Sequence, residues 1–168
     1  MTSTELENTD QTVIEFFSKT TSHQMLETTS SGAISEKSSR IRDMLTRLAI
    51  ETPGVDNGRV RMAAGIVYKK HLIATGVNSY KTHPIMIEEN GYRPGQIFLH
   101  AEVDAIRNAL RLITQDQLTK CELHVVRVKR PRAGSNQWIQ GLAKPCPGCQ
   151  RTIANFGIEK VFWTKDIT

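Results

Sequence analysis

The sequence predicts an α/β domain in which a mixed sheet of about four to five strands is covered by helices. Stretches rich in Val and Ile, typical of strands, alternate with stretches whose apolar residues recur at three and four, typical of helices. In the second half of the chain a helix separates each strand from the next. Such connections produce parallel neighbours in one sheet, with helices on its faces.

Length and composition favour a single globular domain. The 168 residues are 39% hydrophobic and 23% charged, which is ordinary for a globular protein. No apolar run approaches the roughly 20 residues of a membrane-spanning helix. The N-terminus lacks the basic start and apolar core of a secretory signal. We therefore expect a cytoplasmic or nucleoid-associated protein, in a reducing compartment and with no membrane partner.

Charge and composition divide the chain at about residue 38. Residues 1–38 are rich in Ser and Thr and hold six acidic and two basic residues, which predicts a flexible acidic tail. The apolar group Val13–Phe17 interrupts this tail, either as a docking segment or by chance. Residues 39–168 hold 20 basic and 11 acidic residues and are expected to form the domain. A basic domain attracts anions such as nucleotide phosphates or nucleic acid, although its charge can also serve solubility alone.

The first half of the domain predicts a helix followed by a β-hairpin. In SSRIRDMLTRLAIETPG the apolar residues form one helical face, and Ser38 or Ser39 can cap its start. The stretches VRMAAGIVYKK and HLIATGVNS predict the hairpin strands, over about 60–69 and 72–78. The polar stretch over about 80–96 is long enough to predict a functional loop.

The second half predicts two more helices and two more strands. A helix is expected from about His100 to Ile113, a strand over 121–129 and a loop over 131–144. A further helix begins in PCPGCQRTIANFG, because Pro147 suits a first helical turn and Gly157 suits a C-terminal stop. The stretch IEKVFWT predicts the last strand.

The pair Cys146 and Cys149, in KPCPGCQ, permits three interpretations: a redox dithiol, a disulfide, or part of a metal site. A reducing compartment weakens the disulfide interpretation. A structural zinc site uses four protein ligands. The remaining cysteine, Cys121, lies in a strand pattern, where it is expected to be a small buried apolar residue. It therefore supplies no second ligand pair for a structural zinc site.

The tripeptide His100-Ala101-Glu102 opens the preceding helix, one strand before the cysteines. Because neighbouring strand-to-helix junctions fall on the same edge of an α/β sheet, His100 can meet Cys146 and Cys149 there. One imidazole and two thiolates leave one zinc position open, as in catalytic sites, where bound water has a pKa of about 7. Glu102 lies near enough to move that water's proton to a substrate nitrogen.

The signature H-x-E followed by P-C-x-x-C marks zinc nucleobase deaminases, and it stands here at His100–Glu102 and Pro145–Cys149. Over roughly 40–164 the chain resembles the cytidine/deoxycytidylate deaminase superfamily. The resemblance implies a three-layer cytidine-deaminase-like fold, Zn²⁺ as cofactor, and hydrolytic deamination of a cytosine or adenine ring. It also implies that Asn78 contacts the sugar of the substrate and that the backbone of Ala101 lines the base pocket.

The expected substrate is a cytosine nucleotide or nucleoside of the deoxycytidylate type. A histidine ligand is typical of deoxycytidylate and tRNA-type members, whereas free-cytidine deaminases usually have cysteine there. Lys144 stands where many relatives carry an acidic residue. We interpret Lys81, His83 and Lys144 as substrate-binding residues, because cations beside the site suit a phosphate group.

Two alternatives stay open at this point. The first is a base-editing enzyme that acts on single-stranded DNA or tRNA, with Tyr80, His83 or Trp138 stacking on bases. The second is a non-catalytic zinc module that binds nucleic acid or a partner, although such a module has no use for Glu102. We also expect self-association into a homo-oligomer, because an exposed sheet edge invites pairing.

Overall fold

A computed structural model describes residues 36–88 and 98–167 of the chain. Its strands are β1 (Arg61–Tyr68), β2 (His71–Val77), β3 (Glu122–Lys129), β4 (Ile139–Gly141) and β5 (Lys160–Trp163). Its helices are α2 (Glu36–Glu51), α3 (Pro84–Glu88), α4 (Ala101–Ala109), α5 (Gln115–Leu118) and α6 (Pro147–Asn155). The predicted apolar group Val13–Phe17 and most of the predicted tail lie outside the described residues, as does part of the predicted loop over 80–96.

The strands form one mixed sheet in the order β2-β1-β3-β4, with β5 paired to β3. Strand β1 is antiparallel to both β2 and β3, whereas β5 runs parallel to β3. The mixed α/β sheet is therefore confirmed, including its parallel pair. Strand β4 lies inside the predicted loop over 131–144. It has only three residues and depends on pairing with Arg127–Lys129, so no alternating pattern marks it in the sequence.

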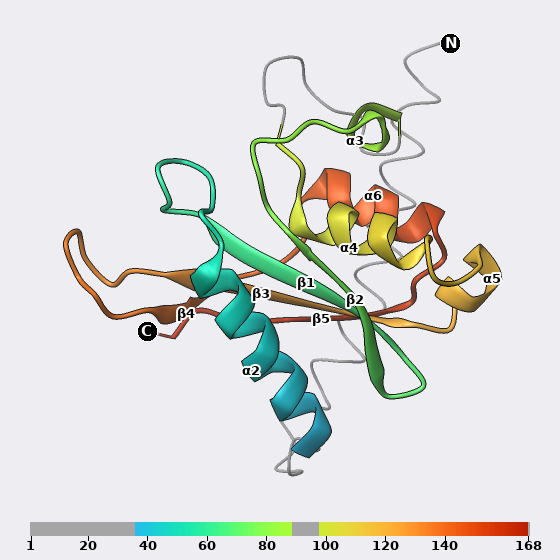
Figure 1. Cartoon of the computed structure of the whole chain (residues 1–168), viewed down its shortest axis with the longest axis horizontal. Helices are drawn as coiled ribbons and strands as arrows, with labels where there is room; N and C mark the ends of the chain where they lie inside the picture. Colours follow the sequence, from blue (N-terminus) through green and yellow to red (C-terminus); the bar gives the residue numbers. More distant parts are fainter. Residues whose placement is uncertain (1–35, 89–97, 168) are drawn as a thin grey trace.

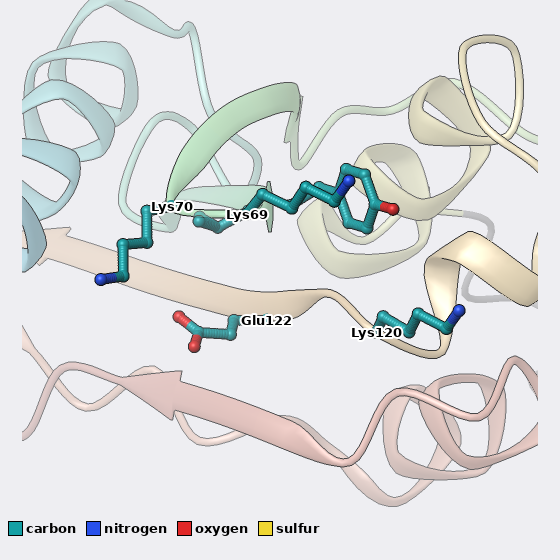
Figure 2. Close-up of a pocket in the computed structure, with 6 residues that line it drawn as sticks. Lys69, Lys70, Lys120 and Glu122 are labelled. Atoms are coloured by element: carbon teal, nitrogen blue, oxygen red, sulfur yellow. The ribbon is translucent and has the colours of Figure 1, made fainter.

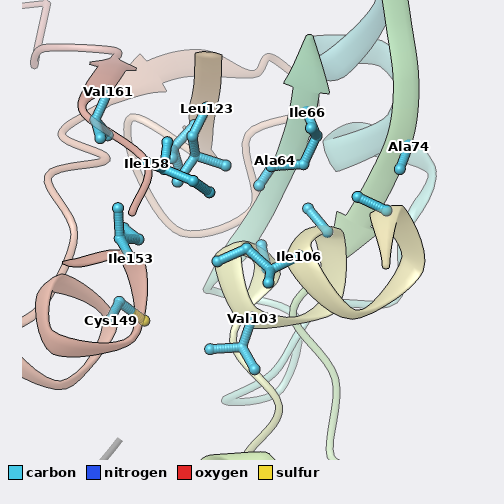
Figure 3. Close-up of a cluster of buried hydrophobic side chains, with 14 of the residues drawn as sticks. Ala64, Ile66, Ala74, Val103, Ile106, Leu123, Cys149, Ile153, Ile158 and Val161 are labelled. Atoms are coloured by element: carbon cyan, nitrogen blue, oxygen red, sulfur yellow. The ribbon is translucent and has the colours of Figure 1, made fainter. Parts of the chain in front are cut away.

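Helices cover both faces of this sheet (Figure 1). On one face, α2 buries Leu45 and Ala49 against Ala63 and Val126. On the other face, α4 and α6 pack over a larger core that joins Ile106 and Ile153 to the sheet (Figure 3). Both faces are apolar, as expected for a sheet covered on two sides. This layering brings the first turns of α4 and α6 onto the same face.

Two predicted helix boundaries are wrong. Helix α2 begins at Glu36, so Ser38 and Ser39 lie inside the helix and do not cap it. Helix α4, predicted from about His100 to Ile113, ends at Ala109. A new N-cap stops its extension, because the Thr114 side chain and Gln117 form a capping box that starts α5.

Cys121 is 2% exposed, which confirms the expected small buried residue. None of the helices in the described residues is long and apolar enough to cross a membrane.

Candidate metal centre

His100 and Cys146 each occupy the residue that caps a helix start. His100 is the N-cap of α4, with extended backbone (φ −79°, ψ 149°) and no capping hydrogen bond from its side chain. Cys146 is the N-cap of α6, and its Sγ accepts a hydrogen bond from the backbone N–H of Cys149. Pro147 follows at the start of that helix, where its missing N–H costs nothing. Both helix N-termini carry partial positive charge, which favours thiolates.

The two motifs meet in space although they are far apart in the sequence. His100 Nδ1 lies 3.1 Å from Cys149 Sγ and 3.5 Å from Cys146 Sγ. The three ligand atoms lie within 4.8 Å of one another, and within residues 36–88 and 98–167 this is the one such group found that could hold a metal. Tetrahedral zinc, with bonds of about 2.0 Å to nitrogen and 2.3 Å to sulfur, separates these atoms by roughly 3.6 Å. The donor set therefore fits zinc.

The charges around the three side chains favour a thiolate at Cys146. Hydrogen bonding from Cys149, together with the contact to His100, lowers the pKa of Cys146 from 9.0 to about 4. The same contact with Cys146 raises the pKa of His100 above 6.5, against the opposing effect of burial. Neither Cys146 nor Cys149 forms a disulfide bond. A thiolate beside an imidazole is the form in which these residues bind zinc.

Glu102 lies buried in the first turn of α4, two residues after His100. The residue is 2% exposed, and its Oε2 has no hydrogen-bond partner among the described residues. Burial is the main cause that raises the pKa of Glu102 above 4.5. An unpartnered buried carboxylate oxygen is costly to the fold. A carboxylate beside a metal ion with an open position can accept and return a proton.

The model of one protein family, described as the cytidine and deoxycytidylate deaminase zinc-binding region, matches residues 36–165. The chain belongs to this deaminase family. The matched region includes all four residues of the centre, His100, Glu102, Cys146 and Cys149.

Two crystal structures of a dCMP deaminase from the cyanophage S-TIM5 are similar to this deaminase chain. The apo form is 21% identical and covers 74% of this chain and 82% of that chain, with a TM-score of 0.47. The complex with dCMP and dUMP is 16% identical and covers 79% and 83% of the two chains, with a TM-score of 0.53. The second comparison shows a shared fold. A comparison with curated proteins finds no sequence match.

Asn78, the predicted sugar contact of the deaminase, is 5% exposed. Its side chain is hydrogen-bonded to strand β1 and to the residue before that strand. Its Oδ1 accepts from the N–H of Met62 at 2.8 Å, and its Nδ2 donates to the carbonyl of Val60 at 2.9 Å. These two bonds hold the end of β2 against the start of β1. The sugar contact therefore stays a prediction for a residue that also has a structural role.

The remaining predicted substrate residues of the deaminase differ in exposure. Ala101 is fully buried in the first turn of α4. Lys81 and Lys144 are exposed, and His83 is partly buried, with its Nδ1 accepting a hydrogen bond from the N–H of Ile85. Their contacts with substrate stay predictions.

A cavity of about 260 Å³ lies at the ends of the deaminase strands that are farther from the metal centre (Figure 2). The end of β1, the turn into β2 and the start of β3 form it, whereas His100 lies beyond the other end of β2. Its walls are formed by Val67, Tyr68, Lys69, Lys70, Lys120 and Glu122. It contains none of the predicted site residues and is separate from the metal centre.

Asp104 is the main residue near the deaminase centre that the sequence analysis missed. It is 8% exposed on the buried face of α4, where its carboxylate contacts the backbone of β2. The sequence feature that could have revealed Asp104 is its pairing with Asn108. The two are polar residues one helical turn apart, among small and apolar neighbours. Such a pair on a buried face needs hydrogen-bond partners across the interface.

Proposed function

We propose that the chain is a zinc-dependent hydrolytic deaminase of a cytosine nucleotide or nucleoside, of the deoxycytidylate type. The observation that carries the proposal is the unpartnered oxygen of buried Glu102 beside a cluster of one imidazole and two thiols. Membership of the deaminase family supports the reaction class. The similar fold that was crystallised with dCMP and dUMP supports the substrate class.

His100, Cys146 and Cys149 would hold the ion through Nδ1 and two Sγ atoms. When bound, zinc supplies a Lewis acid that lowers the pKa of water towards neutrality. Glu102 Oε2 would accept the two protons of the attacking water in turn and pass one to the ring nitrogen N3 and one to the amino group, so that a carbonyl forms at C4 and ammonia leaves. Because Glu102 is 2% exposed, bulk water has little access to these protons.

We assign the substrate contacts to five residues. Asn78 would hold the sugar and the backbone of Ala101 would line the base pocket. Lys81, His83 and Lys144 would bind a phosphate, for which the exposed lysines offer charge-assisted hydrogen bonds. Lys144 is the sharpest of these assignments, because it lies two residues before the zinc ligand Cys146.

An ammonia-release panel tests this function, with cytidine, CMP, dCMP, dCTP, adenosine, single-stranded DNA and tRNA as substrates. We expect dCMP to give the highest kcat/KM and the purified protein to hold about one zinc per chain. An active protein without metal would refute the zinc chemistry. A zinc-containing protein that releases ammonia from none of these substrates would instead favour the non-catalytic module.

A variant pair tests the phosphate contact. Lys144→Gln is expected to raise KM for dCMP and leave KM for deoxycytidine unchanged, because only the nucleotide carries a phosphate. Lys165→Gln is the matched control, an exposed lysine in the C-terminal segment after β5. Equal effects of Lys144→Gln on both substrates would remove Lys144 from phosphate binding.

A second candidate function is deamination within a single-stranded nucleic acid. Tyr80 is 56% exposed beside Phe98, with the ring centroids 4.9 Å apart. The guanidinium groups of Arg61 and Arg130 lie 4.5 Å and 4.9 Å from the centroid of Trp138. Aromatic rings among cations suit stacked bases and a phosphate backbone.

Salt dependence separates the two candidate functions. A polynucleotide substrate should lose affinity steeply with salt, with a logarithmic slope of about 0.7 for each phosphate contact on a single strand. A free nucleotide, with one phosphate group, should show a much shallower dependence. A steep slope together with ammonia release from single-stranded DNA or tRNA would favour the second candidate.

A further inference from the structure

We propose that Asp104 is a positioning residue, which holds the metal-binding turn of α4 against the end of β2. This inference rests on the proposed function, because it concerns the zinc ligand His100 and the proton carrier Glu102. Asp104 is not one of the three residues that could hold the metal, and it would act through the helix turn that carries His100 and Glu102.

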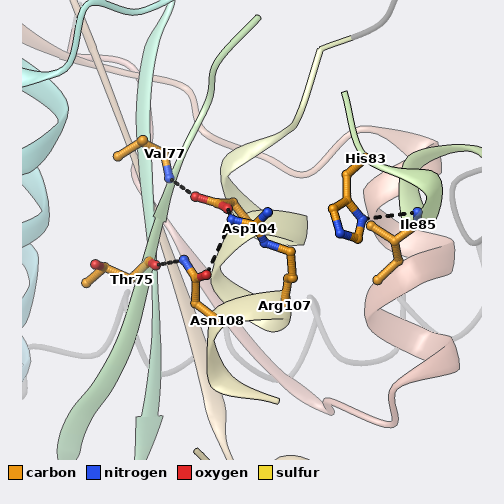
Figure 4. A network of polar contacts seen from close by, with 7 residues as sticks. All are labelled: Thr75, Val77, His83, Ile85, Asp104, Arg107 and Asn108. Carbon is orange, nitrogen blue, oxygen red and sulfur yellow. Dashed lines mark hydrogen bonds and ion pairs between the residues drawn. The ribbon is translucent and has the colours of Figure 1, made fainter. Parts of the chain in front are cut away.

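Strand β2 has a strand partner on one side only, β1, within the described residues. Helix α4 contacts the backbone on its other side (Figure 4). Asp104 Oδ2 accepts a hydrogen bond from the N–H of Val77 at 3.1 Å, and Asn108 Nδ2 donates to the carbonyl of Thr75 at 2.8 Å. Asp104 and Asn108 lie one helical turn apart, so they meet backbone groups two residues apart on the strand. The helix therefore satisfies the backbone groups that an edge strand otherwise exposes.

Gly76 lies between these two hydrogen bonds and allows the helix to approach closely. A Cβ atom at Gly76 would lie 2.5 Å from the carbonyl oxygen of Ala101 and closer still to the backbone N of Ala105. The backbones of α4 and β2 are therefore packed without an intervening side chain. Such close packing leaves little room for α4 to move towards β2. The hydrogen bonds of Asp104 and Asn108 keep α4 in register along the strand.

Asp104 links the metal-binding turn to the strand through both its backbone and its side chain. Its N–H donates to the carbonyl of His100 at 3.0 Å, which closes the first turn of α4. Its carboxylate binds Val77, directly before Asn78, whose side chain is anchored on Val60 and Met62. One residue thus connects the zinc ligand to the strand end where the sugar contact is predicted.

The carboxylate of Asp104 is compensated by one cation. Arg107 Nη2 donates to Asp104 Oδ1 at 2.6 Å, and the two side chains are 28% and 11% exposed. A nearly buried charge is stable when it is paired and hydrogen-bonded, as here. Both oxygens are occupied, so Asp104 has a fixed orientation and is suited to positioning rather than to proton transfer.

The experiment compares two alanine variants of the full-length protein. Asp104→Ala removes the bond next to the metal-binding turn, and Asn108→Ala removes a comparable bond one turn further along the same helix and strand. Each variant also removes a contact with Arg107 Nη2, which donates to Asp104 Oδ1 at 2.6 Å and to Asn108 Oδ1 at 3.4 Å. Residues that orient ligands typically change metal affinity by about 10–100-fold when replaced. We expect Asp104→Ala to weaken zinc affinity about tenfold or more in a chelator competition, and Asn108→Ala to change it less than twofold. Thermal unfolding of both variants shows whether their losses of stability are similar.

A conservative variant provides the rescue. Asp104→Asn keeps an oxygen that can accept from the N–H of Val77, so we expect zinc affinity near that of the wild type. If Asp104→Ala does not fold, Asp104→Glu replaces it, because the longer side chain keeps the charge but shifts the contact. Asp104→Glu is then expected to fold and to bind zinc more weakly.

The outcomes separate this inference from the proposed function. Equal zinc affinities for the Asp104→Ala and Asn108→Ala variants, or wild-type affinity in Asp104→Ala, would refute the positioning role. If the wild type binds zinc but releases no ammonia, the proposed function fails, while the zinc affinities still decide the role of Asp104. A wild type without zinc affinity would refute both.

Discussion

Replacing Glu102 with Gln should abolish most of the chemistry while leaving the fold at least as stable. Gln has nearly the same size but cannot carry the proton. General acid–base groups contribute about 10²–10⁴-fold to rate, so ammonia release should fall by that factor. This loss corresponds to about 3–5 kcal/mol of transition-state stabilisation. The zinc content should stay unchanged, because Glu102 is not among the three ligand residues.

The stability of the same variant should depend on pH in a defined direction. Burial raises the pKa of Glu102 above 4.5, so the folded protein keeps a proton that the unfolded chain releases as pH rises. The stabilising contribution of Glu102 is thus complete below pH 4.5 and lost as pH rises through its folded-state pKa. An unpartnered buried polar group costs about 1–3 kcal/mol. Compared with the wild type, Glu102→Gln should therefore gain up to about that much at pH 8 and little at pH 4.

Ammonia release is measured on the zinc-loaded protein. Unfolding by denaturant is measured on the zinc-free protein, because the charge of the ion would otherwise mask the effect of the Glu102 carboxylate on stability. Asp116→Asn in α5 is the control, an exposed acidic residue that should change neither measurement. Retained turnover in Glu102→Gln would assign the proton transfer to another group. A loss of stability at pH 8 would show that Oε2 has a partner in the folded protein.

Three more predictions concern the metal, a strained turn and a buried histidine. Cys146→Ser should lose most of its zinc, measured by metal analysis after dialysis, because it removes one of two thiolates; full zinc content would contradict the ligand set. Lys70→Gly should raise the free energy of unfolding by about 1 kcal/mol in urea, because Lys70 has φ of 68°, which favours glycine. A less stable variant would show that the lysine side chain makes a compensating contact. His124 is 8% exposed, and burial lowers its pKa below 6.5, so its contribution to stability is present above pH 6.5 and decreases as pH falls towards the folded-state pKa. His124→Gln should flatten this part of the pH profile of urea unfolding, and an unchanged slope would exclude His124 as its source.

The elements that the sequence predicted well are those with local signals. Helices α4 and α6 begin where expected because His100 and Pro147 stand at positions set by short-range backbone geometry. The end of α4 was misplaced because the apolar spacing continues to Ile113, which packs on the core although the helix has already ended. Periodicity reports which side chains are buried, and it does so here beyond the helix itself.

Helix α4 covers part of the sheet edge through which self-association is expected. At Thr75 and Val77 the outer side of β2 is already bonded to Asn108 and Asp104. That part of the edge is not free to pair with another chain. Size-exclusion measurements with light scattering would give the oligomeric state directly.

By itself, the sequence determined the chemical groups of the centre. His100, Glu102, Cys146 and Cys149 could be read from two short motifs, because each motif opens a helix and local geometry brings its own residues together. Tertiary structure alone decided that the motifs meet, since His100 and Cys149 are 49 residues apart and yet 3.1 Å from one another. It also decided that Glu102 is buried and that Asp104 binds the backbone of Val77, 27 residues away. These features depend on how α4, α6 and the sheet pack, and packing between distant segments leaves no periodic signal in the sequence.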